Sequence, residues 1–293
     1  MKMKKILAVL LAAFMMIGVM AGCGDNKTPA DTPNDDGEIK TVTPGKLTIA
    51  TSPDFAPMEF VDASKEGQDS FVGFDITLAK YIAEKMGLEL VISPMDFYAC
   101  QAAVSTGSVD MAISGFSWLP ERAENYNLSD TYHAGGNEDG QTTICMKSNG
   151  DKFKDAKNYE GLKVGVQGGS LQEYLAKIQL PDAEIVVYQD ITTGVLQLRN
   201  GDFDIMAVAD GNAEAIIAAN ADVALTGFDF EVSEEYTDNL ILLRKGNDVL
   251  TAKVNEILAE AKAANLYEGW YAAAKELAGI EVSYDENGNP ITE

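Results

Sequence analysis

One short pattern occurs twice in the chain and constrains its fold more than any other feature. The pattern is apolar-x-x-Gly-x-apolar-Asp-apolar, where x is any residue. The copies run from Val104 to Met111 and from Leu198 to Ile205, with their glycines 94 residues apart, which is about the length of a small domain. In each copy a helix would end at the glycine and an apolar strand would follow. We therefore expect two similar units, each built of helices and strands.

The segments around the copies alternate between strand-like and helix-like hydrophobic periods. In the first unit, residues 47–50 are rich in β-formers, Asp75 is placed to cap a helix, Gly87 is placed to end it, and residues 88–92 form an apolar run. The same order of strand, helix and strand returns between residues 162 and 188. Such alternation predicts parallel sheets with crossover helices, so the expected fold class is α/β.

Polar residues follow both repeated strands. Ser114, Gly115 and Ser117 come after the first strand, and Asp210 comes after the second. The carboxyl ends of parallel strands form the edge at which open α/β sheets bind ligands. Two such edges that face each other predict a cleft between two lobes.

The charge and the scarcity of metal-binding residues exclude whole classes of function. The chain has 46 acidic and 22 basic residues and a net charge of −24, which opposes binding to nucleic acid through a basic groove. Its cysteines and its one histidine, Cys23, Cys100, Cys145 and His133, show no CxxC or HxxxH spacing. We expect no metal site and no cofactor.

The first 22 residues read as a secretory signal peptide, because three lysines precede an acid-free apolar run from Ile6 to Met20. The run ends in Met20-Ala21-Gly22-Cys23, which resembles a bacterial lipobox. This predicts lipidation at Cys23, a flexible tether over residues 23–44, and anchoring to the outer face of the cell membrane. The alternative is an ordinary cleaved leader with an incidental cysteine.

Six segments resemble, in order, the signatures of the family 3 extracellular solute-binding proteins, the amino-acid receptors of ABC importers. They are residues 50–60, 71–79, 114–122, 128–132, 164–170 and 201–210. The resemblance extends over roughly residues 45 to 275, and several motifs in the expected order are more specific than any one of them.

The resemblance implies a two-lobed periplasmic-binding-protein-like fold, with a hinge and an interlobe cleft that closes on one amino acid. We expect residues 45–135 and 242–293 to form lobe 1, the latter range including a polar tail, and residues 136–241 to form lobe 2. The two crossings would lie near residues 133–142 and 238–242. The implied partners are the transmembrane subunits of an ABC permease, and the expected state is a monomer.

The resemblance also assigns the group that would bind the ligand carboxylate. Arg122 matches the carboxylate-binding arginine of the family, Gly115 and Ser117 match neighbouring donors, and Ser170 would add donors from lobe 2 near a helix N-terminus. The alternative for Arg122 is a solvated arginine at the start of a helix.

For the ligand ammonium, Asp210 matches the acidic residue of the family, although an acid directly after a strand is also a common helix cap. Ser52 stands where several members of the family carry aspartate, and Asp54 follows two residues later. Either Asp54 takes that role or the ammonium relies more on Asp210.

Five residues lie on or near the positions that form the side-chain pocket: Phe55, Phe97, Tyr98, Cys100 and Trp118. Aromatic faces favour an apolar or amide-bearing side chain, so a polar or neutral amino acid is expected, although Phe97 and Trp118 are equally suited to a core. Cys100 and Cys145 would lie in different lobes as free thiols.

Three functions fit these observations. The first is a membrane-anchored receptor that delivers an amino acid to an ABC permease. The second is a dehydratase, because relatives with this fold dehydrate cyclic precursors, but no histidine or lysine beside the motifs is placed to donate the proton that this reaction needs. The third is a sensor that feeds a signalling partner.

Overall fold

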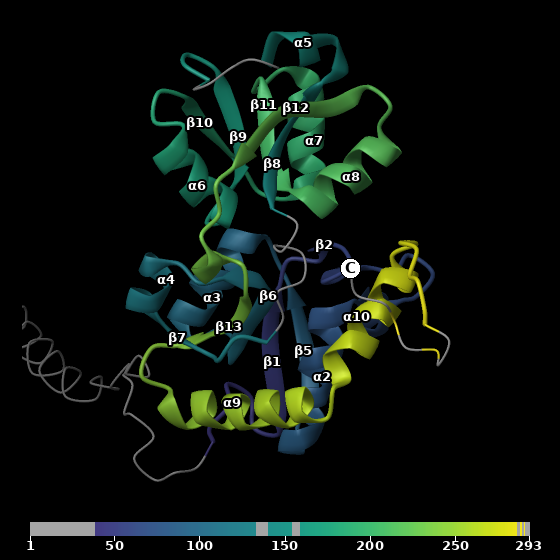
Figure 1. The fold of residues 1–293 in the computed structure, drawn as a ribbon. Helices are drawn as coiled ribbons and strands as arrows, with labels where there is room; N and C mark the ends of the chain where they lie inside the picture. Colours follow the sequence, from purple (N-terminus) through teal and green to yellow (C-terminus); the bar gives the residue numbers. More distant parts are fainter. Residues whose placement is uncertain (1–38, 133–139, 154–158, 286–287, 289, 291–293) are drawn as a thin grey trace, which may run out of the picture.

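The computed structural model describes residues 39–132, 140–153, 159–285, 288 and 290. The predicted leader, Cys23 and His133 lie outside these residues. The chain folds into two α/β lobes, one above the other in Figure 1. Among the described helices, none is both long enough and apolar enough to cross a membrane.

Lobe 1 is built on a five-stranded sheet of order β5-β1-β6-β13-β7. Strand β1 runs parallel to β5 and β6, and β13 runs antiparallel to β6 and β7. A second, three-stranded sheet has the order β2-β3-β4. The strands are β1 (Lys46–Thr51), β2 (Asp54–Phe55), β3 (Glu59–Val61), β4 (Phe71–Val72), β5 (Glu89–Pro94), β6 (Met111–Ser117), β7 (Tyr126–Leu128) and β13 (Asn239–Arg244). The helices are η1 (Gly67–Ser70), α2 (Phe74–Met86), α3 (Phe97–Thr106), α4 (Pro120–Asn125), α9 (Asp248–Ala263) and α10 (Leu266–Leu277).

Lobe 2 is built on a five-stranded sheet of order β10-β9-β11-β8-β12. Strand β9 runs parallel to β10 and β11, and β8 runs antiparallel to β11 and β12. The strands are β8 (Gln141–Met146), β9 (Lys163–Gln167), β10 (Glu184–Tyr188), β11 (Ile205–Ala209) and β12 (Val223–Phe230). The helices are η2 (Lys147–Asn149), α5 (Gly150–Phe153), α6 (Leu171–Gln179), α7 (Ile191–Asn200), α8 (Asp210–Ala219) and η3 (Glu234–Tyr236).

The repeated sequence pattern forms the same helix-to-strand connection in both lobes. Helix α3 ends at Gly107 and α7 ends at Gly201, with φ of 72° and 77°, values that favour glycine because it lacks a Cβ atom. Each helix begins at an aspartate, Asp96 or Asp190, whose side chain accepts a main-chain N–H three residues on. The strand that follows each glycine, β6 or β11, lies in the middle of its sheet.

Asp75 does not cap α2, contrary to the sequence-based expectation. The N-cap residue is Gly73, and Asp75 lies in the first turn with its side chain fully buried. It turns inward because it accepts hydrogen bonds from the Gly115 N–H at 2.8 Å and from the Tyr132 hydroxyl at 2.9 Å.

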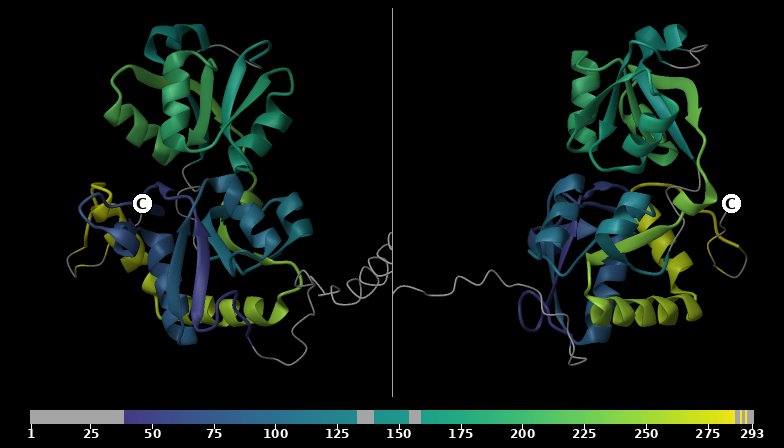
Figure 2. Two further views of the ribbon diagram at one scale, coloured as in Figure 1. Left: turned by 180° about the vertical axis from the view of Figure 1, so that it is seen from behind. Right: turned by 90° about the vertical axis from the view of Figure 1, so that its left-hand side faces the viewer.

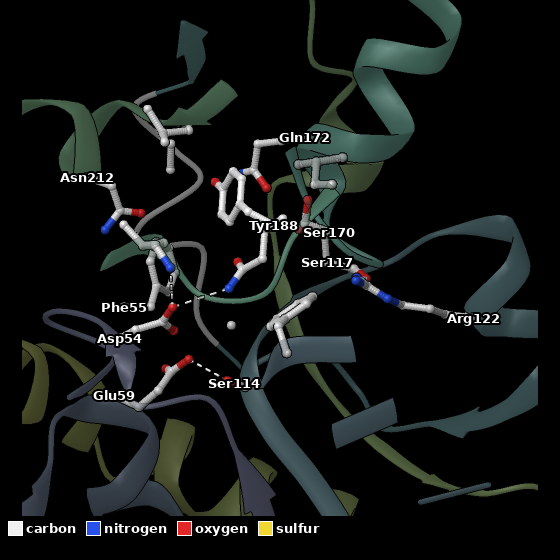
Figure 3. A pocket seen from close by; sticks show the side chains of 17 residues that line it. Asp54, Phe55, Glu59, Ser114, Ser117, Arg122, Ser170, Gln172, Tyr188 and Asn212 are labelled. Atoms are coloured by element: carbon white, nitrogen blue, oxygen red, sulfur yellow. Dashed lines mark hydrogen bonds between the residues drawn. The ribbon is translucent and has the colours of Figure 1, made fainter. Parts of the chain in front are cut away.

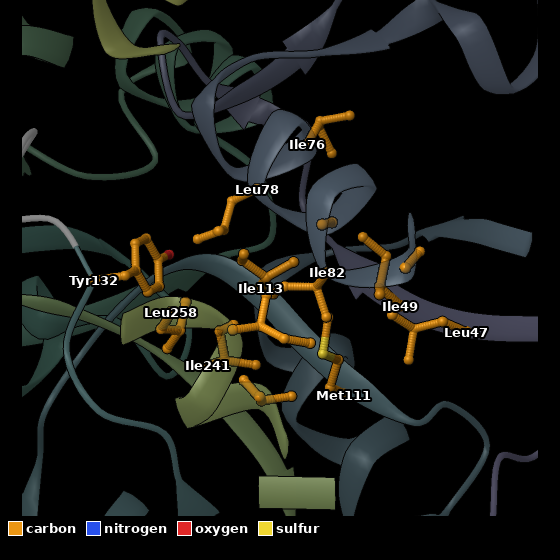
Figure 4. Packing of buried hydrophobic residues seen from close by; sticks show 14 of the residues in the cluster. Leu47, Ile49, Ile76, Leu78, Ile82, Met111, Ile113, Tyr132, Ile241 and Leu258 are labelled. Carbon is orange, nitrogen blue, oxygen red and sulfur yellow. The ribbon is translucent and has the colours of Figure 1, made fainter. Parts of the chain in front are cut away.

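The core of lobe 1 lies on both faces of its sheet. One apolar cluster packs under α2, α9 and α10, where Ile82, Ile113 and Leu258 meet (Figure 4). The other packs under α3 and includes Cys100 and Phe116. Lobe 2 likewise has two clusters, and Cys145 lies in one of them. Cys100 and Cys145 are therefore buried free cysteines in different lobes.

One of the two expected boundaries between the lobes falls inside a strand of the structure. Strand β13 begins at Asn239 and pairs with β6, so the expected boundary after residue 241 falls inside a lobe 1 strand. The apolar run from Leu240 to Leu243 keeps the strand unbroken. Figure 2 shows that the segment between β12 and β13 runs along one side of the molecule. The other expected boundary, at residues 135–136, lies outside the described residues.

The end of the expected tether contacts lobe 1. The Val42 N–H donates to Asp110 Oδ1 at 2.6 Å, and Ile39 packs against the cluster under α2. Asp110 also accepts the Thr48 N–H at 2.7 Å. The aspartate of the first repeated pattern thus ties this segment to strand β1.

Candidate functional site

A cleft between the lobes brings together the carboxyl ends of strands from both sheets. Its lobe 1 wall carries Asp54, Glu59, Ser117 and Arg122, and the strand ends β9, β10 and β11 contribute from lobe 2. In Figure 3, Arg122 points toward Ser117 and Ser170 on one side, while Asp54 and Glu59 lie on the other side. The cleft is therefore polarised, with a cation at one end and two carboxyl groups at the other.

Arg122 is held rigidly at the lobe boundary. Its Nη1 donates to the Ser117 carbonyl at 2.5 Å and its Nη2 donates to the Gly169 carbonyl, in lobe 2, at 2.6 Å. The guanidinium lies over the rings of Phe97 and Phe116, with its central carbon 5.6 Å and 5.1 Å from the ring centroids. The side chain is only 2% exposed, which excludes the alternative of a solvated arginine.

Arg122 has no salt bridge with a carboxylate among the described residues, and its Nε has no hydrogen-bond acceptor there. Burial lowers the pKa of Arg122 to about 9. A buried cation without an opposite charge is costly. The position is therefore suited to an anionic group from outside the chain.

The other residues expected at the carboxylate also line the cleft, but not all of their donors are available. The Gly115 N–H already donates to Asp75, so it does not point at the cleft. Gly115 has φ of 57°, and a Cβ atom there would touch the Phe55 ring. Ser170 caps α6, where its hydroxyl oxygen accepts the Glu173 N–H at 3.1 Å. The Ser170 hydroxyl proton therefore remains for a ligand.

Asp54 joins the lobes at the other end of the cleft. Its Oδ2 accepts the Ile191 N–H at 2.8 Å and Gln167 Nε2 at 3.3 Å, both from lobe 2, and its Oδ1 accepts the Ser52 hydroxyl at 2.9 Å. Burial is the main reason that the pKa of Asp54 is raised. Ser52 itself is not among the residues that line the cleft.

The expected ammonium-binding residue Asp210 is not among the residues that line the cleft. It is the first residue of α8, and its N–H donates to the Gly140 carbonyl at 3.2 Å. The helical turn directs Asn212, two residues on, into the cleft instead.

Only two of the five residues expected in the side-chain pocket, Phe55 and Phe97, line the cleft. Tyr98 is 65% exposed, and Cys100 is buried in the lobe 1 core. Trp118 stacks on Tyr236 with 6.1 Å between ring centroids, which places it at the connection between the lobes.

Several lining residues were missed by sequence reasoning. In lobe 1 the missed residue is Glu59, whose Oε1 accepts at 2.6 Å the hydroxyl of Ser114, a residue that the sequence did place at this edge. In lobe 2 they are Gln167, Leu171, Gln172, Tyr188, Ile191, Val208, Ala209 and Asn212. Glu59, Gln167, Val208 and Ala209 lie inside motifs that carried the resemblance, so a role in the cleft was open to inference. The other missed residues of lobe 2 lie outside those motifs.

The described residues contain no group of three or more histidine, cysteine, aspartate or glutamate side chains placed to hold a metal ion. The chemistry of the cleft is that of one guanidinium, two carboxyl groups, amides and hydroxyls around three aromatic rings. Such a set is suited to a small molecule that carries both an anionic and a cationic group.

Comparison with known proteins gives consistent matches. The arginine-binding extracellular protein ArtP of Bacillus subtilis (strain 168) is 30% identical over 280 residues, which cover 93% of this chain and 100% of that protein. The crystal structure of AbpA, an amino acid ABC transporter substrate-binding protein of Streptococcus pneumoniae bound to L-arginine, is 30% identical with a TM-score of 0.68. That match covers 81% of this chain and 97% of AbpA.

One similar protein is an enzyme. Cyclohexadienyl dehydratase of Pseudomonas aeruginosa is 29% identical over 164 residues, which cover 55% of this chain and 58% of the enzyme. A family model also matches, that of the bacterial extracellular solute-binding proteins, family 3, which aligns with residues 47–273. Because that alignment takes in both lobes and every wall of the cleft, the chain belongs to this family and is an amino-acid receptor.

Proposed function

We propose that the cleft binds an L-amino acid with its carboxylate at Arg122, and that the receptor delivers this ligand to an ABC permease. The observation that carries the proposal is the buried guanidinium of Arg122, which has no carboxylate partner among the described residues. A ligand carboxylate would offset the cost of this burial through charge-assisted hydrogen bonds. The hydroxyl of Ser170 lies on the same side of the cleft (Figure 3).

The opposite end of the cleft favours cationic groups. Asp54 and Glu59 lie there, and one carboxylate suffices for the ligand ammonium. The second carboxyl group favours a ligand whose side chain is cationic or rich in hydrogen-bond donors. We propose L-arginine as the first ligand to test among the polar or neutral amino acids expected from the sequence. This choice agrees with the name of ArtP, an arginine-binding protein, and with the L-arginine bound in the AbpA structure.

Calorimetry on the mature chain tests this assignment. Arg122→Ala should weaken arginine binding by at least about 2 kcal/mol, because a buried ionic hydrogen bond loses one partner. Arg199→Ala is the matched control, since Arg199 is an exposed arginine that pairs with Asp222 in lobe 2. Equal affinities of the parent and Arg122→Ala would remove Arg122 from the site.

The proposed cellular setting is the outer face of the cell membrane, with a lipid on Cys23 as the anchor. The lipobox-like residues 20–23 support it. Cys23→Ala should abolish metabolic labelling with a radioactive fatty acid and release the receptor from the membrane fraction. Unchanged labelling would contradict lipidation at this cysteine.

A dehydratase is the second candidate, and one observation favours it. Glu59 lines the cleft, and burial raises its pKa well above the usual range, so it offers a protonated carboxyl group to a leaving group. The described cleft has no histidine or lysine to share the proton transfer. We therefore expect no turnover of prephenate or L-arogenate, and product formation that Glu59→Gln abolishes would replace the receptor proposal.

A further inference from the structure

A pair of buried carboxyl groups lies at the floor of the cleft. Glu59, on β3, is 1% exposed and lines the cleft, while Asp75, on α2, is fully buried behind it. Adjacent residues of β6, Ser114 and Gly115, donate hydrogen bonds to Glu59 and Asp75 respectively, which places the two carboxyl groups next to each other. Glu59 Oε1 accepts the Ser114 hydroxyl, but Oε2 has no hydrogen-bond donor among the described residues.

The two carboxyl groups accept different numbers of hydrogen bonds from the protein. Asp75 accepts two hydrogen bonds, from the Gly115 N–H and the Tyr132 hydroxyl, which stabilise a negative charge. Glu59 accepts one. An ionised Glu59 would therefore face an ionised Asp75 with one oxygen unsatisfied, and a single proton on Glu59 resolves both problems.

The groups that face the pair do not supply a compensating positive charge. They are Asp54 from β2, Cys100 from α3, Tyr132 after β7 and, through Tyr132, Tyr267 from α10, while β6 contributes the neutral Ser114 and Gly115. Neither carboxyl group forms a salt bridge among the described residues. Burial, with the neighbouring carboxylate as a second cause, raises the pKa of Glu59 well above its usual range, and burial raises the pKa of Asp75 to about 7.

We propose that Glu59 and Asp75 share one proton, and that a ligand with a cationic side chain displaces this proton while a neutral ligand of the same shape leaves it in place. The displacement of the proton rests on the proposed function, because it needs the ligand to lie in the cleft against Glu59. A positive charge beside a carboxyl group favours its ionised form. The proton passes to the buffer, and the cationic side chain takes its place as the partner of Glu59.

This makes selectivity depend on pH. Binding that releases a proton strengthens as the pH rises, by up to about tenfold per pH unit for one full proton. Binding of a neutral ligand has no such dependence on the pair. The receptor therefore discriminates between cationic and neutral amino acids more strongly in neutral medium than in acid.

L-arginine and its neutral isostere L-citrulline provide the test. Calorimetric titrations of the mature receptor at pH 7, in phosphate and in Tris, give the number of protons released from the difference between the observed enthalpies. We expect the receptor to release a proton when it binds arginine and none when it binds citrulline. Arginine affinity should also rise between pH 6 and 7 while citrulline affinity stays level.

Glu59→Gln keeps the shape of the protonated side chain and should abolish both the release and the pH dependence for arginine. Glu84→Gln, an exposed acid on α2, is the matched control and should keep both. If Glu59→Gln does not fold, the comparison of the two ligands on the parent receptor still decides the proposal. The proposal would be overturned if arginine bound with equal enthalpies in the two buffers. It would also be overturned if arginine and citrulline released equal numbers of protons.

A measurement without ligand separates this proposal from the proposed function. The infrared spectrum at pH 7 should contain the carbonyl band of a protonated carboxyl group, and this band should be missing in Glu59→Gln. Its absence from the parent would overturn the shared proton whether or not arginine binds. Failure of every amino acid to bind would overturn the proposed function, and with it the displacement step, while leaving the carboxyl band in place.

Discussion

At the scale of single residues, burial governs the charges of the cleft. It lowers the pKa of Arg122 to about 9 and raises the pKa of Asp54, so it opposes the charged form of each. The two side chains nevertheless reach main-chain groups in the opposite lobe, at Gly169 and Ile191. A zwitterionic ligand would stabilise both charged forms at once.

The buried carboxyl pair should make stability depend on pH. Burial raises the pKa of both members of the pair, that of Asp75 from 3.8 to about 7, so between about pH 4 and pH 7 the pair retains its shared proton while the unfolded chain loses the protons of both groups. The free energy of unfolding should therefore fall as the pH rises through this window. Urea unfolding of Asp75→Asn, measured across the same window, should show a flatter dependence.

Asp62→Asn is the control for this prediction, because its pKa is lowered to about 2 by hydrogen bonds from Ser64. A carboxyl group with a lowered pKa contributes stability that is present above its unfolded pKa and lost in stronger acid. Asp62→Asn should leave the slope between about pH 4 and 7 unchanged. An unaltered slope in Asp75→Asn would contradict the assignment.

At the scale of elements, the turn that leads into α6 bonds to lobe 1, caps its own helix and lines the cleft. The Gly169 carbonyl accepts hydrogen bonds from Arg122 and from Gln101, and its N–H donates to Glu173 at 2.5 Å. Gly169 has φ of 72°, and a Cβ atom there would collide with the Gln101 amide. The next residue, Ser170, caps the helix and lines the cleft.

Two substitutions of Ser170 should separate its roles. Ser170→Ala should lower the free energy of unfolding by about 1 kcal/mol, because the helix loses its cap, whereas Ser170→Gly should cost only a few tenths of that. Both variants lose the hydroxyl group and should weaken arginine binding to a similar degree. Urea melts and calorimetry on the two variants measure this, and equal stabilities would show that the cap contributes little.

At the scale of the whole molecule, direct contacts already join the lobes. Asp54, Gln101 and Arg122 of lobe 1 all bond to lobe 2. These bonds favour the closed arrangement without reference to a ligand. A ligand that touches both lobes then adds to an existing bias.

Asp54→Ala should shift the unliganded receptor toward open forms. The change removes the acceptor of the Ile191 N–H and of Gln167 Nε2, and hydrogen bonds to a charged group contribute roughly 1.5–3 kcal/mol. The ratio of closed to open forms should fall by about tenfold or more, and small-angle scattering records the shift as a larger radius of gyration. Asp69→Ala, an exposed acid on lobe 1, is the control, and equal radii would show that Asp54 does not hold the lobes together.

The sequence predicted the fold well because its signals are local. The repeated glycines end α3 and α7, and the apolar runs after them form central strands. The side-chain pocket was harder, because Phe97, Tyr98 and Cys100 are close in sequence but project from a helix in different directions. Phe97 lines the cleft, Tyr98 faces solvent, and Cys100 enters the core.

Other parts of the site depend on contacts that no local pattern contains. Glu59 and Asp75 come from a strand and a helix, and only the tertiary fold brings them together. Asp210 directly follows an apolar strand, but α8 begins at that residue and directs Asn212 into the cleft. The direction of a side chain at the junction of strand and helix depends on backbone geometry that residue type alone does not determine.

Because of Leu119, the balance between closed and open lobes should depend on temperature. This residue of lobe 1 is buried in the apolar cluster of lobe 2, and its neighbour Trp118 packs against the same cluster. Separation of the lobes must therefore expose hydrocarbon surface to water. Because hydrophobic stabilisation weakens on cooling, the closed form loses part of its advantage in the cold, whichever amino acid is bound.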